Sequence, residues 1–178
     1  TITPPAIHFM VKTGHDKPQD GTVNRQGARC IACGTSVPFN YIRSEGKAGR
    51  MSSQLVAIVA EGQHGRAYIS PDKEQVIIAQ QATPLGVPET DLPERALSFR
   101  VQVYGMTKHR DLFTPRQLAT LTTLSDLVRE AREKALNAAI SAGLPVDGIS
   151  FIDGGMGANA YSDALATYMA IAVDRLAD

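Results

Sequence analysis

The clearest hydrophobic periodicity lies in the C-terminal part of the chain. Apolar residues recur every three or four positions after Thr114, where Thr-Pro-Arg-Gln matches an N-cap, a first-turn proline and a capping-box glutamine. Gly143 and Pro145 end this pattern, which predicts an amphipathic helix of about seven turns. A second helix is predicted over residues 159–178; it is apolar on most sides, so we expect it to be buried between other elements.

The second predicted helix has no stop signal. No Gly, Asn or Pro follows Leu176, so the last carbonyls lack an evident capping partner. This pattern is typical of a chain that was cut inside or just after a helix. We therefore expect the sequence to be an internal piece of a larger protein.

The first half shows short β-prone runs separated by polar or glycine-rich segments. The predicted strands are 6–12, 37–43, 55–60, 66–70 and 99–104. The third and fourth should pair as a hairpin with a longer loop. Residues 44–53 are too rich in Gly and Ser to predict a regular element. Ser70 and Pro71 resemble an N-cap and first helical residue, and predict a helix that reaches Ala82.

Prolines divide the chain. Pro84, Pro88 and Pro93 make residues 83–97 an irregular connection between a β-rich region, 1–82, and a strand plus two-helix region, 98–178. The expected fold class is α+β, with short antiparallel strands and a half zinc ribbon followed by two long α-helices.

Composition narrows the function classes. The 178 residues carry no net charge, so the whole chain lacks the bulk signature of a nucleic-acid binder. Residues 1–66 hold eight Lys or Arg against four Asp or Glu, which makes that half the candidate for phosphate contact. No apolar run approaches the roughly 18 residues of a membrane span, and no signal peptide is evident. We expect a cytoplasmic protein without a membrane partner.

Two cysteines form the most chemically specific motif. Cys30-Ile-Ala-Cys33-Gly34 has the spacing of a zinc knuckle, in which two thiolates on a tight turn bind one tetrahedral ion. A structural site needs four ligands, and the chain has no second cysteine pair. The others would come from histidines such as His8 and His15, from another chain, or from sequence outside this piece. A redox pair is the alternative.

A cationic stretch follows the cysteines. Arg43, Lys47 and Arg50 lie among glycines, and a flexible stretch of this kind can follow a phosphate backbone. These three are the candidate DNA-binding residues. The alternative is a solvated loop without a ligand.

Two other motifs have structural interpretations. Gly155-Met-Gly157-Ala-Asn-Ala160 follows Ile149–Ile152 and resembles a dinucleotide fingerprint, but no acidic residue ends a second strand at the required distance. A glycine turn before a helix is the favoured interpretation. His109-Arg110-Asp111 mimics a kinase catalytic loop without the other kinase motifs, so Asp111 is interpreted as a residue that precedes a helix start.

Nine segments between about residue 20 and the end share one resemblance: 21–23, 28–34, 41–51, 61–68, 103–107, 111–118, 122–128, 160–168 and 173–178. Together they resemble the zinc-ribbon-containing adenine-specific DNA methylases of bacteria. The resemblance implies a large enzyme that transfers a methyl group from S-adenosylmethionine to adenine N6, with the base flipped out of DNA.

The resemblance also implies what this chain lacks. In the family, the cofactor motif and the first cysteine pair lie upstream and an Asp-Pro-Pro-Tyr-like catalytic motif lies downstream, whereas Cys30 and Cys33 match the second cysteine pair. No catalytic or S-adenosylmethionine-binding residue is therefore expected here. The implied role is insertion or DNA recognition, with the remainder of the methylase chain and DNA as partners and zinc as a half-site cofactor. The alternative is a free-standing, non-enzymatic module that binds nucleic acid or forms a homodimer through its helices.

Overall fold

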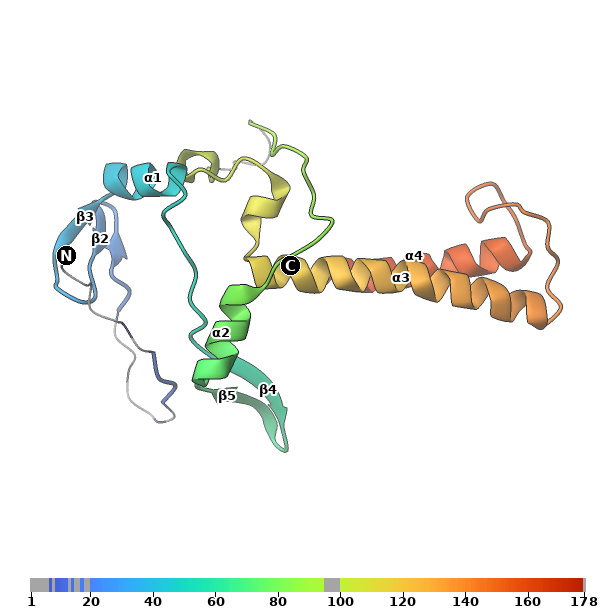
Figure 1. The fold of residues 1–178 in the computed structure, drawn as a ribbon, viewed down its shortest axis with the longest axis horizontal. Coiled ribbons are helices and arrows are strands. Elements are labelled where there is room, and N and C mark those ends of the chain that lie inside the picture. The colour runs from blue at the N-terminus through green and yellow to red at the C-terminus, as the bar shows by residue number, and fades with distance from the viewer. Residues whose placement is uncertain are drawn as a thin grey trace. The chain divides into compact units, whose positions relative to one another are not determined.

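The computed structural model describes residues 7, 9–12, 14, 17, 20–94 and 100–177. They form an α+β fold with short antiparallel strands in two small sheets, followed by two long helices, as the sequence predicts (Figure 1). The chain divides into two compact units. The first contains Thr1–Ala82 and Pro88–Thr114, and the second contains Thr83–Val87 and Pro115–Asp178.

A three-stranded antiparallel sheet begins the first unit. Its strands are β1 (Val23–Asn24), β2 (Gly27–Arg29) and β3 (Ser36–Pro38), paired in that order. Helix α1 (Phe39–Lys47) starts directly after β3. The predicted strand 37–43 is therefore wrong after Pro38, and the prediction of no regular element in 44–53 is wrong up to Lys47.

The residue that precedes α1 and the packing of α1 explain why a helix forms at this position. Pro38 is extended, with φ −72° and ψ 154°, and serves as the N-cap, so the chain changes from strand to helix within one residue. Along α1, Phe39, Ile42 and Gly46 recur at helical spacing and lie on one side. Gly46 contacts the backbone of Tyr104 there. Tertiary packing thus overrides the low helix propensity of glycine.

The second sheet is a hairpin of β4 (Ile58–Gly62) and β5 (Gly65–Ile69). Gly62 pairs with Gly65, so Gln63 and His64 alone form the turn. The predicted hairpin is confirmed, although its loop is shorter than expected. Helix α2 (Lys73–Gln81) follows, and Asp72 and Gln75 form its capping box. The helix is confirmed, but its N-cap lies two residues after the predicted Ser70, because Asp72 and Gln75 have the box spacing.

Two predicted strands are not found. Residues 7 and 9–12 are not in a strand, and the rest of that prediction lies outside the described residues. In place of the strand predicted at 99–104, the short 3-10 helix η1 (Gln102–Tyr104) ends at Gly105 with φ +88°, and Phe99 is not described. An alternating pattern as short as this one does not distinguish a strand from a packed turn.

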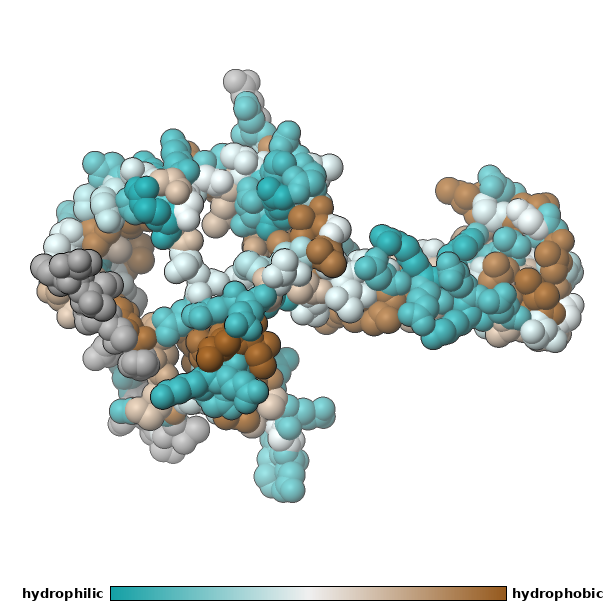
Figure 2. Space-filling model, in the orientation of Figure 1, coloured by the Kyte–Doolittle hydropathy of each residue, from teal (hydrophilic) through white to brown (hydrophobic). Residues whose placement is uncertain are grey.

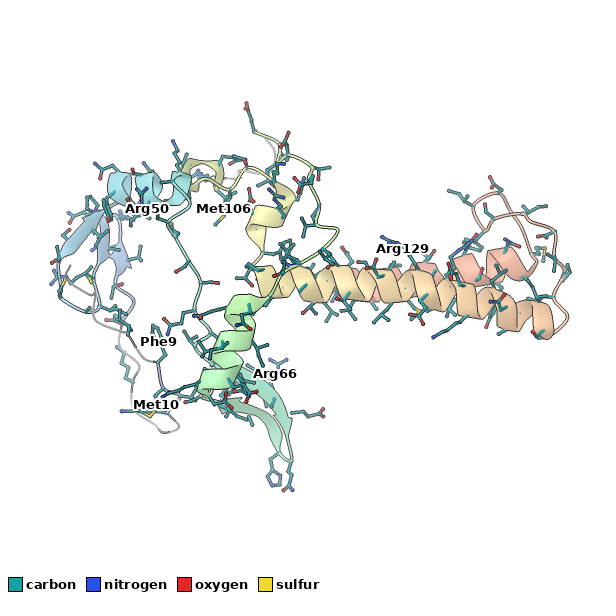
Figure 3. The ribbon with its side chains drawn as sticks, in the orientation of Figure 1. Phe9, Met10, Arg50, Arg66, Met106 and Arg129 are labelled. Carbon is teal, nitrogen blue, oxygen red and sulfur yellow. The ribbon has the colours of Figure 1, made fainter. Side chains whose placement is uncertain are left out.

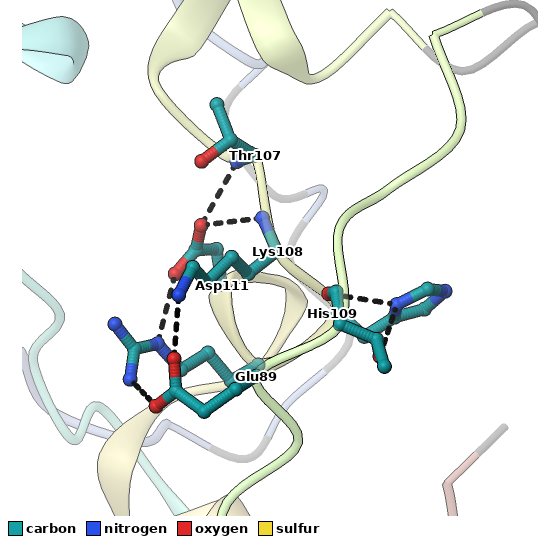
Figure 4. A network of polar contacts seen from close by, with 7 residues as sticks. Glu89, Thr107, Lys108, His109 and Asp111 are labelled. Atoms are coloured by element: carbon teal, nitrogen blue, oxygen red, sulfur yellow. Dashed lines mark hydrogen bonds and ion pairs between the residues drawn. The ribbon is translucent and has the colours of Figure 1, made fainter.

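The residues of the His-Arg-Asp motif organise a local polar network (Figure 4). The Asp111 carboxylate accepts hydrogen bonds from the backbone amides of Thr107 and Lys108, both at 2.8 Å, and so caps the 3-10 helix η2 (His109–Leu112). Glu89 pairs with Lys108 at 2.5 Å and with Arg110. The interpretation of this motif as structural fits these contacts.

The second unit is a helical hairpin. Helix α3 (Pro115–Ser141) and helix α4 (Ala158–Asp174) lie side by side, and α4 runs back along α3 (Figure 1). Both predicted helices are confirmed, with α4 ending four residues earlier than expected. Gly143 has φ +87° and closes α3 as its sequence position predicts. The buried residues of these helices are Leu118, Ala139, Ala158, Ala160 and Ser162.

Within the second unit, the expectation that α4 is buried between other elements is wrong. Among the described residues of that unit, only the α3-facing side of α4 is covered, because a two-helix hairpin offers each helix one partner. Tyr168 is 75% exposed and Ile171 55% exposed. Among the described helices, none is long and apolar enough to cross a membrane.

Candidate functional site

The two cysteines lie on the turn that joins β2 to β3. The Cys30 amide donates to the Thr35 carbonyl at 2.9 Å, and the Gly34 amide donates to the Cys30 carbonyl at the same distance. Gly34 has φ +73°, a conformation that side chains disfavour, so the glycine of the motif is what permits the turn to close. Both thiols therefore project from one tight loop, as the knuckle spacing predicts.

The turn also alters the chemistry of one thiol. Cys33 is exposed, and its Sγ lies 3.1 Å from the Thr35 hydroxyl. Hydrogen bonds with the Thr35 side chain, the Thr35 backbone and the Cys30 side chain lower the pKa of Cys33 below its usual value. Since thiolates are the form that binds zinc and reacts as a nucleophile, this turn favours the ligating state.

The two thiols of Cys30 and Cys33 number half of the four ligands that a tetrahedral zinc site needs. Within residues 7, 9–12, 14, 17, 20–94 and 100–177, no group of three or more His, Cys, Asp or Glu side chains could hold a metal ion. The histidines considered as further ligands, His8 and His15, lie outside the described residues. Cys30 and Cys33 thus fit two of the four ligands of a structural zinc, by the chemistry of their donor atoms.

The three candidate DNA-binding residues do not form a flexible stretch. Arg43 and Lys47 lie four residues apart on α1 and are exposed on the same side of that helix. Arg43 is positioned by aromatic rings, because its guanidinium carbon lies 5.8 Å from the Phe39 ring centroid and 5.9 Å from that of Tyr104. Cation–π contacts of this kind hold the cation in place while leaving its edge accessible.

Arg50 has a different environment. Its guanidinium donates two hydrogen bonds to the Glu45 carboxylate, at 2.6 and 2.7 Å. Figure 3 labels Arg50 beside α1. The side-chain hydrogen bond from Arg50 lowers the pKa of Glu45, and the same pair raises the pKa of Arg50. A phosphate would have to displace a bidentate carboxylate there. Arg43 and Lys47 are therefore the better candidates of the three.

A pocket of about 780 Å³ lies beside Arg43 in the first unit. Its charged lining consists of two cations, Arg43 and Arg100, and two acids, Asp91 and Glu94. Because these charges balance, the described lining does not favour an anion over a cation.

The glycines before α4 have a packing role. A Cβ atom at Gly155 would lie 2.3 Å from the Ile149 carbonyl oxygen, and one at Gly157 would lie 2.3 Å from that of Pro145. Residues 149–152 contain no strand, which the dinucleotide fingerprint requires. The glycine-turn interpretation is thus the one these contacts support.

Sequence reasoning missed two residues that contact the candidate site residues. The first is Thr35, which hydrogen-bonds to Cys33 within the turn. Its position two residues after the second cysteine of the knuckle was a local signal that could have predicted this contact. Tyr104 reaches Arg43 from a segment 61 positions later, and no local pattern indicates that contact.

Comparison with known proteins adds no relative. No protein-family model, curated protein or solved structure matches the chain.

Proposed function

We propose that this chain is a non-catalytic region of an adenine-specific DNA methyltransferase, in which Cys30 and Cys33 contribute one half of a zinc site. The observation that carries the proposal is the knuckle turn: two thiols on residues 30–33, closed by Gly34 in a left-handed conformation. Such a turn between antiparallel strands is the supporting unit of a zinc ribbon. The family resemblance of the flanking segments supports the parent activity.

The other half of the site would come from a second cysteine pair in the parent protein. Two thiolates leave two tetrahedral positions open, and zinc completes its structural sites with cysteine or histidine. In this arrangement the ion would join the three-stranded sheet to another part of the methylase. Methyl transfer itself would belong to the remainder of the parent, which would supply the S-adenosylmethionine and base-binding groups.

DNA contact would be an accessory function of α1. Arg43 and Lys47 are exposed on one helix side, and among the residues that the structure describes neither forms an ion pair with a carboxylate, as Arg50 does. Cations of this kind position a protein on the phosphate backbone without reading sequence. This role also suits a free-standing nucleic-acid-binding module, the competing hypothesis, so it does not distinguish the two.

Zinc content tests the half-site. We expect about one zinc per molecule in a chain extended to include the preceding segment of its gene, and loss of that zinc in Cys30→Ser and Cys33→Ser variants. The matched control is Ser36→Ala, which changes a neighbouring residue without removing a ligand. Cobalt substitution should give the thiolate-to-metal absorption of a four-sulfur site in the extended chain.

Two results would overturn the proposal. An extended chain without zinc would remove the half-site, and an extended chain that binds zinc equally well without Cys30 and Cys33 would place the site elsewhere. For the parent activity, the full-length protein should methylate adenine, and the 178-residue chain should show no S-adenosylmethionine binding by calorimetry.

A further inference from the structure

The outward side of α4 differs in character from that of α3. Helix α3 carries seven charged residues, some of them in ion pairs along its surface, such as Arg129 with Asp126 at 2.8 Å and Lys134 with Glu130 at 2.6 Å. Figure 2 shows a hydrophilic surface along the visible side of α3. Helix α4 has only Asp163 and Asp174 as charged residues. The hairpin thus has one solvated helix and one apolar helix.

Neither acid of α4 lies on its outward side. Asp163 faces α3, where it accepts hydrogen bonds from Arg132 at 2.7 Å and from the Phe151 amide at 3.1 Å. At 100° per residue, Asp174 falls on the same side as Asp163. The opposite side is uncharged, and we call it the α4 apolar face. Its members are Tyr161, Ala164, Leu165, Tyr168, Met169, Ile171 and Ala172.

We propose that the α4 apolar face is the interface of a homodimer, in which a second copy of the chain packs α4 against α4. The face is uncharged from Tyr161 to Ala172, and Arg175 follows on the same side directly after the helix. In an antiparallel pair the two Arg175 side chains lie at opposite ends, so the face can meet itself without like-charge repulsion, which a twofold interface requires. The result is four helical layers in the order α3, α4, α4 and α3. The charged helices then lie outside in water, and the apolar helices lie inside.

The five large side chains of this face supply more than half of the area that such a contact needs. Tyr161, Leu165, Tyr168, Met169 and Ile171 are 55, 40, 75, 37 and 55% exposed. These five side chains expose on the order of 500 Å². A stable interface buries about 800 Å² on each partner, and the intervening alanines and flanking backbone add to the five large residues.

The order of residues also permits an antiparallel register. Tyr161, Leu165, Tyr168 and Ala172 recur at spacings of four, three and four, the pattern of a two-helix seam. With the twofold axis between Ala166 and Thr167, Tyr161 would lie over Ala172 of the second copy, and Leu165 would lie over Tyr168. Each large ring then faces a smaller side chain, as close packing requires.

The test is the mass of the intact chain in solution, measured by sedimentation equilibrium with and without a metal chelator. We expect twice the 19.1 kDa chain mass in both conditions. The double variant Leu165→Glu/Tyr168→Glu should raise the dimer dissociation constant by about 100-fold or more, because four carboxylates would meet at the interface. Both residues are exposed in one chain, so circular dichroism should show unchanged helix content. The control, Ile78→Glu, alters a 61% exposed residue of α2 and should leave the dimer intact.

Three outcomes would overturn the inference. They are a wild-type chain that is monomeric throughout, a double variant that dimerises like the wild type, and a dimer that the chelator dissociates. The last would assign the contact to the cysteine knuckle. This inference does not depend on the proposed function, because zinc content and dimer mass are measured separately.

Discussion

Gly46 and Gly105 bring two backbone segments of the first unit into direct contact. A Cβ atom at Gly105 would lie 2.6 Å from the Gly46 carbonyl oxygen, and a Cβ at Gly46 would lie 2.4 Å from the Tyr104 carbonyl oxygen. Gly105 also has φ +88°. This contact holds α1 against η1, and it places the Tyr104 ring beside Arg43. The position of a candidate DNA-binding residue thus depends on two glycines.

Replacing Gly46 with alanine should destabilise the first unit. In an isolated helix the change would be favourable by about 1 kcal/mol, because alanine has the higher helix propensity. Here the added methyl group would overlap a carbonyl oxygen, and overpacking costs about 1–3 kcal/mol, so the net sign should reverse. Urea unfolding of the two proteins measures the difference. The control is Gly21→Ala, where nothing lies within 4 Å of the added atom; equal stability of Gly46→Ala and wild type would contradict the contact.

The same contact explains why sequence reasoning failed for α1. Residues 39–47 include Gly46 and Ser44, which lower helix propensity, and local signals therefore indicate an irregular segment. The compensating contact lies almost 60 positions later in sequence. By contrast, α2, α3, α4 and the β4–β5 hairpin were predictable, because their caps, turns and periodicity are local. The knuckle was predictable for the same reason, whereas the stacking of Arg43 on Tyr104 was not.

The burial of α4 was mispredicted for another physical reason. Its apolar composition predicts a helix that packs against apolar surfaces, but composition does not say whether those surfaces belong to the same chain. In the hairpin, Asp163 and Ser162 face α3, while Tyr168 faces away from it. A sequence pattern indicates how much of a helix surface is apolar, but it does not identify the element or chain that packs against that surface.

Thr35 should control the reactivity of Cys33. The Thr35 hydroxyl is the largest cause of the lowered Cys33 pKa. Replacing Thr35 with valine removes that hydroxyl while keeping the β-branched shape, so the pKa of Cys33 should rise toward its ordinary value. The rate of alkylation by iodoacetamide as a function of pH measures this change. Wild-type Cys33 should reach half its maximal rate at a lower pH than the variant; superimposable pH profiles would show that the hydrogen bond has no effect on the thiol.

Acid should weaken the α3–α4 hairpin through Asp163. The Phe151 amide, followed by the Arg132 side chain, lowers the pKa of Asp163 in the folded chain. A carboxylate with a lowered folded pKa stabilises the fold above its unfolded pKa of about 3.9, and this contribution is lost as the pH falls through the folded pKa. Asp163→Asn should therefore unfold at a lower temperature than wild type at neutral pH, with the gap narrowing in acid. Thermal unfolding from neutral to acid pH tests this, with Arg132→Lys as the charge-preserving comparison. A gap that does not change with pH would contradict it.

Removing both exposed cations of α1 should weaken DNA binding and its dependence on salt. Arg43 and Lys47 lie on one helix side, so one phosphate backbone can contact both. Each phosphate contact contributes about 0.9 to the slope of the logarithm of affinity against the logarithm of salt concentration. The Arg43→Ala/Lys47→Ala variant should therefore lower that slope by about 2. Fluorescence anisotropy with a labelled duplex, measured over a series of salt concentrations, gives the slope directly.

Arg50→Ala should change DNA binding less than Arg43→Ala or Lys47→Ala alone, because Arg50 is already bonded to Glu45. Removing Arg50 also leaves the Glu45 carboxylate without this partner, but Glu45 lies on the opposite side of α1 from Arg43 and Lys47, so it should repel phosphate only weakly. Glu45→Gln separates these effects, since it releases Arg50 and removes the negative charge, and it should raise affinity.

The control with the same charge change as the double α1 variant is Arg129→Ala/Lys134→Ala, which removes two paired cations from α3. If this control lowers the salt slope as much as the double α1 variant does, the attraction of the chain to DNA comes from its net charge, and α1 does not contact phosphate specifically.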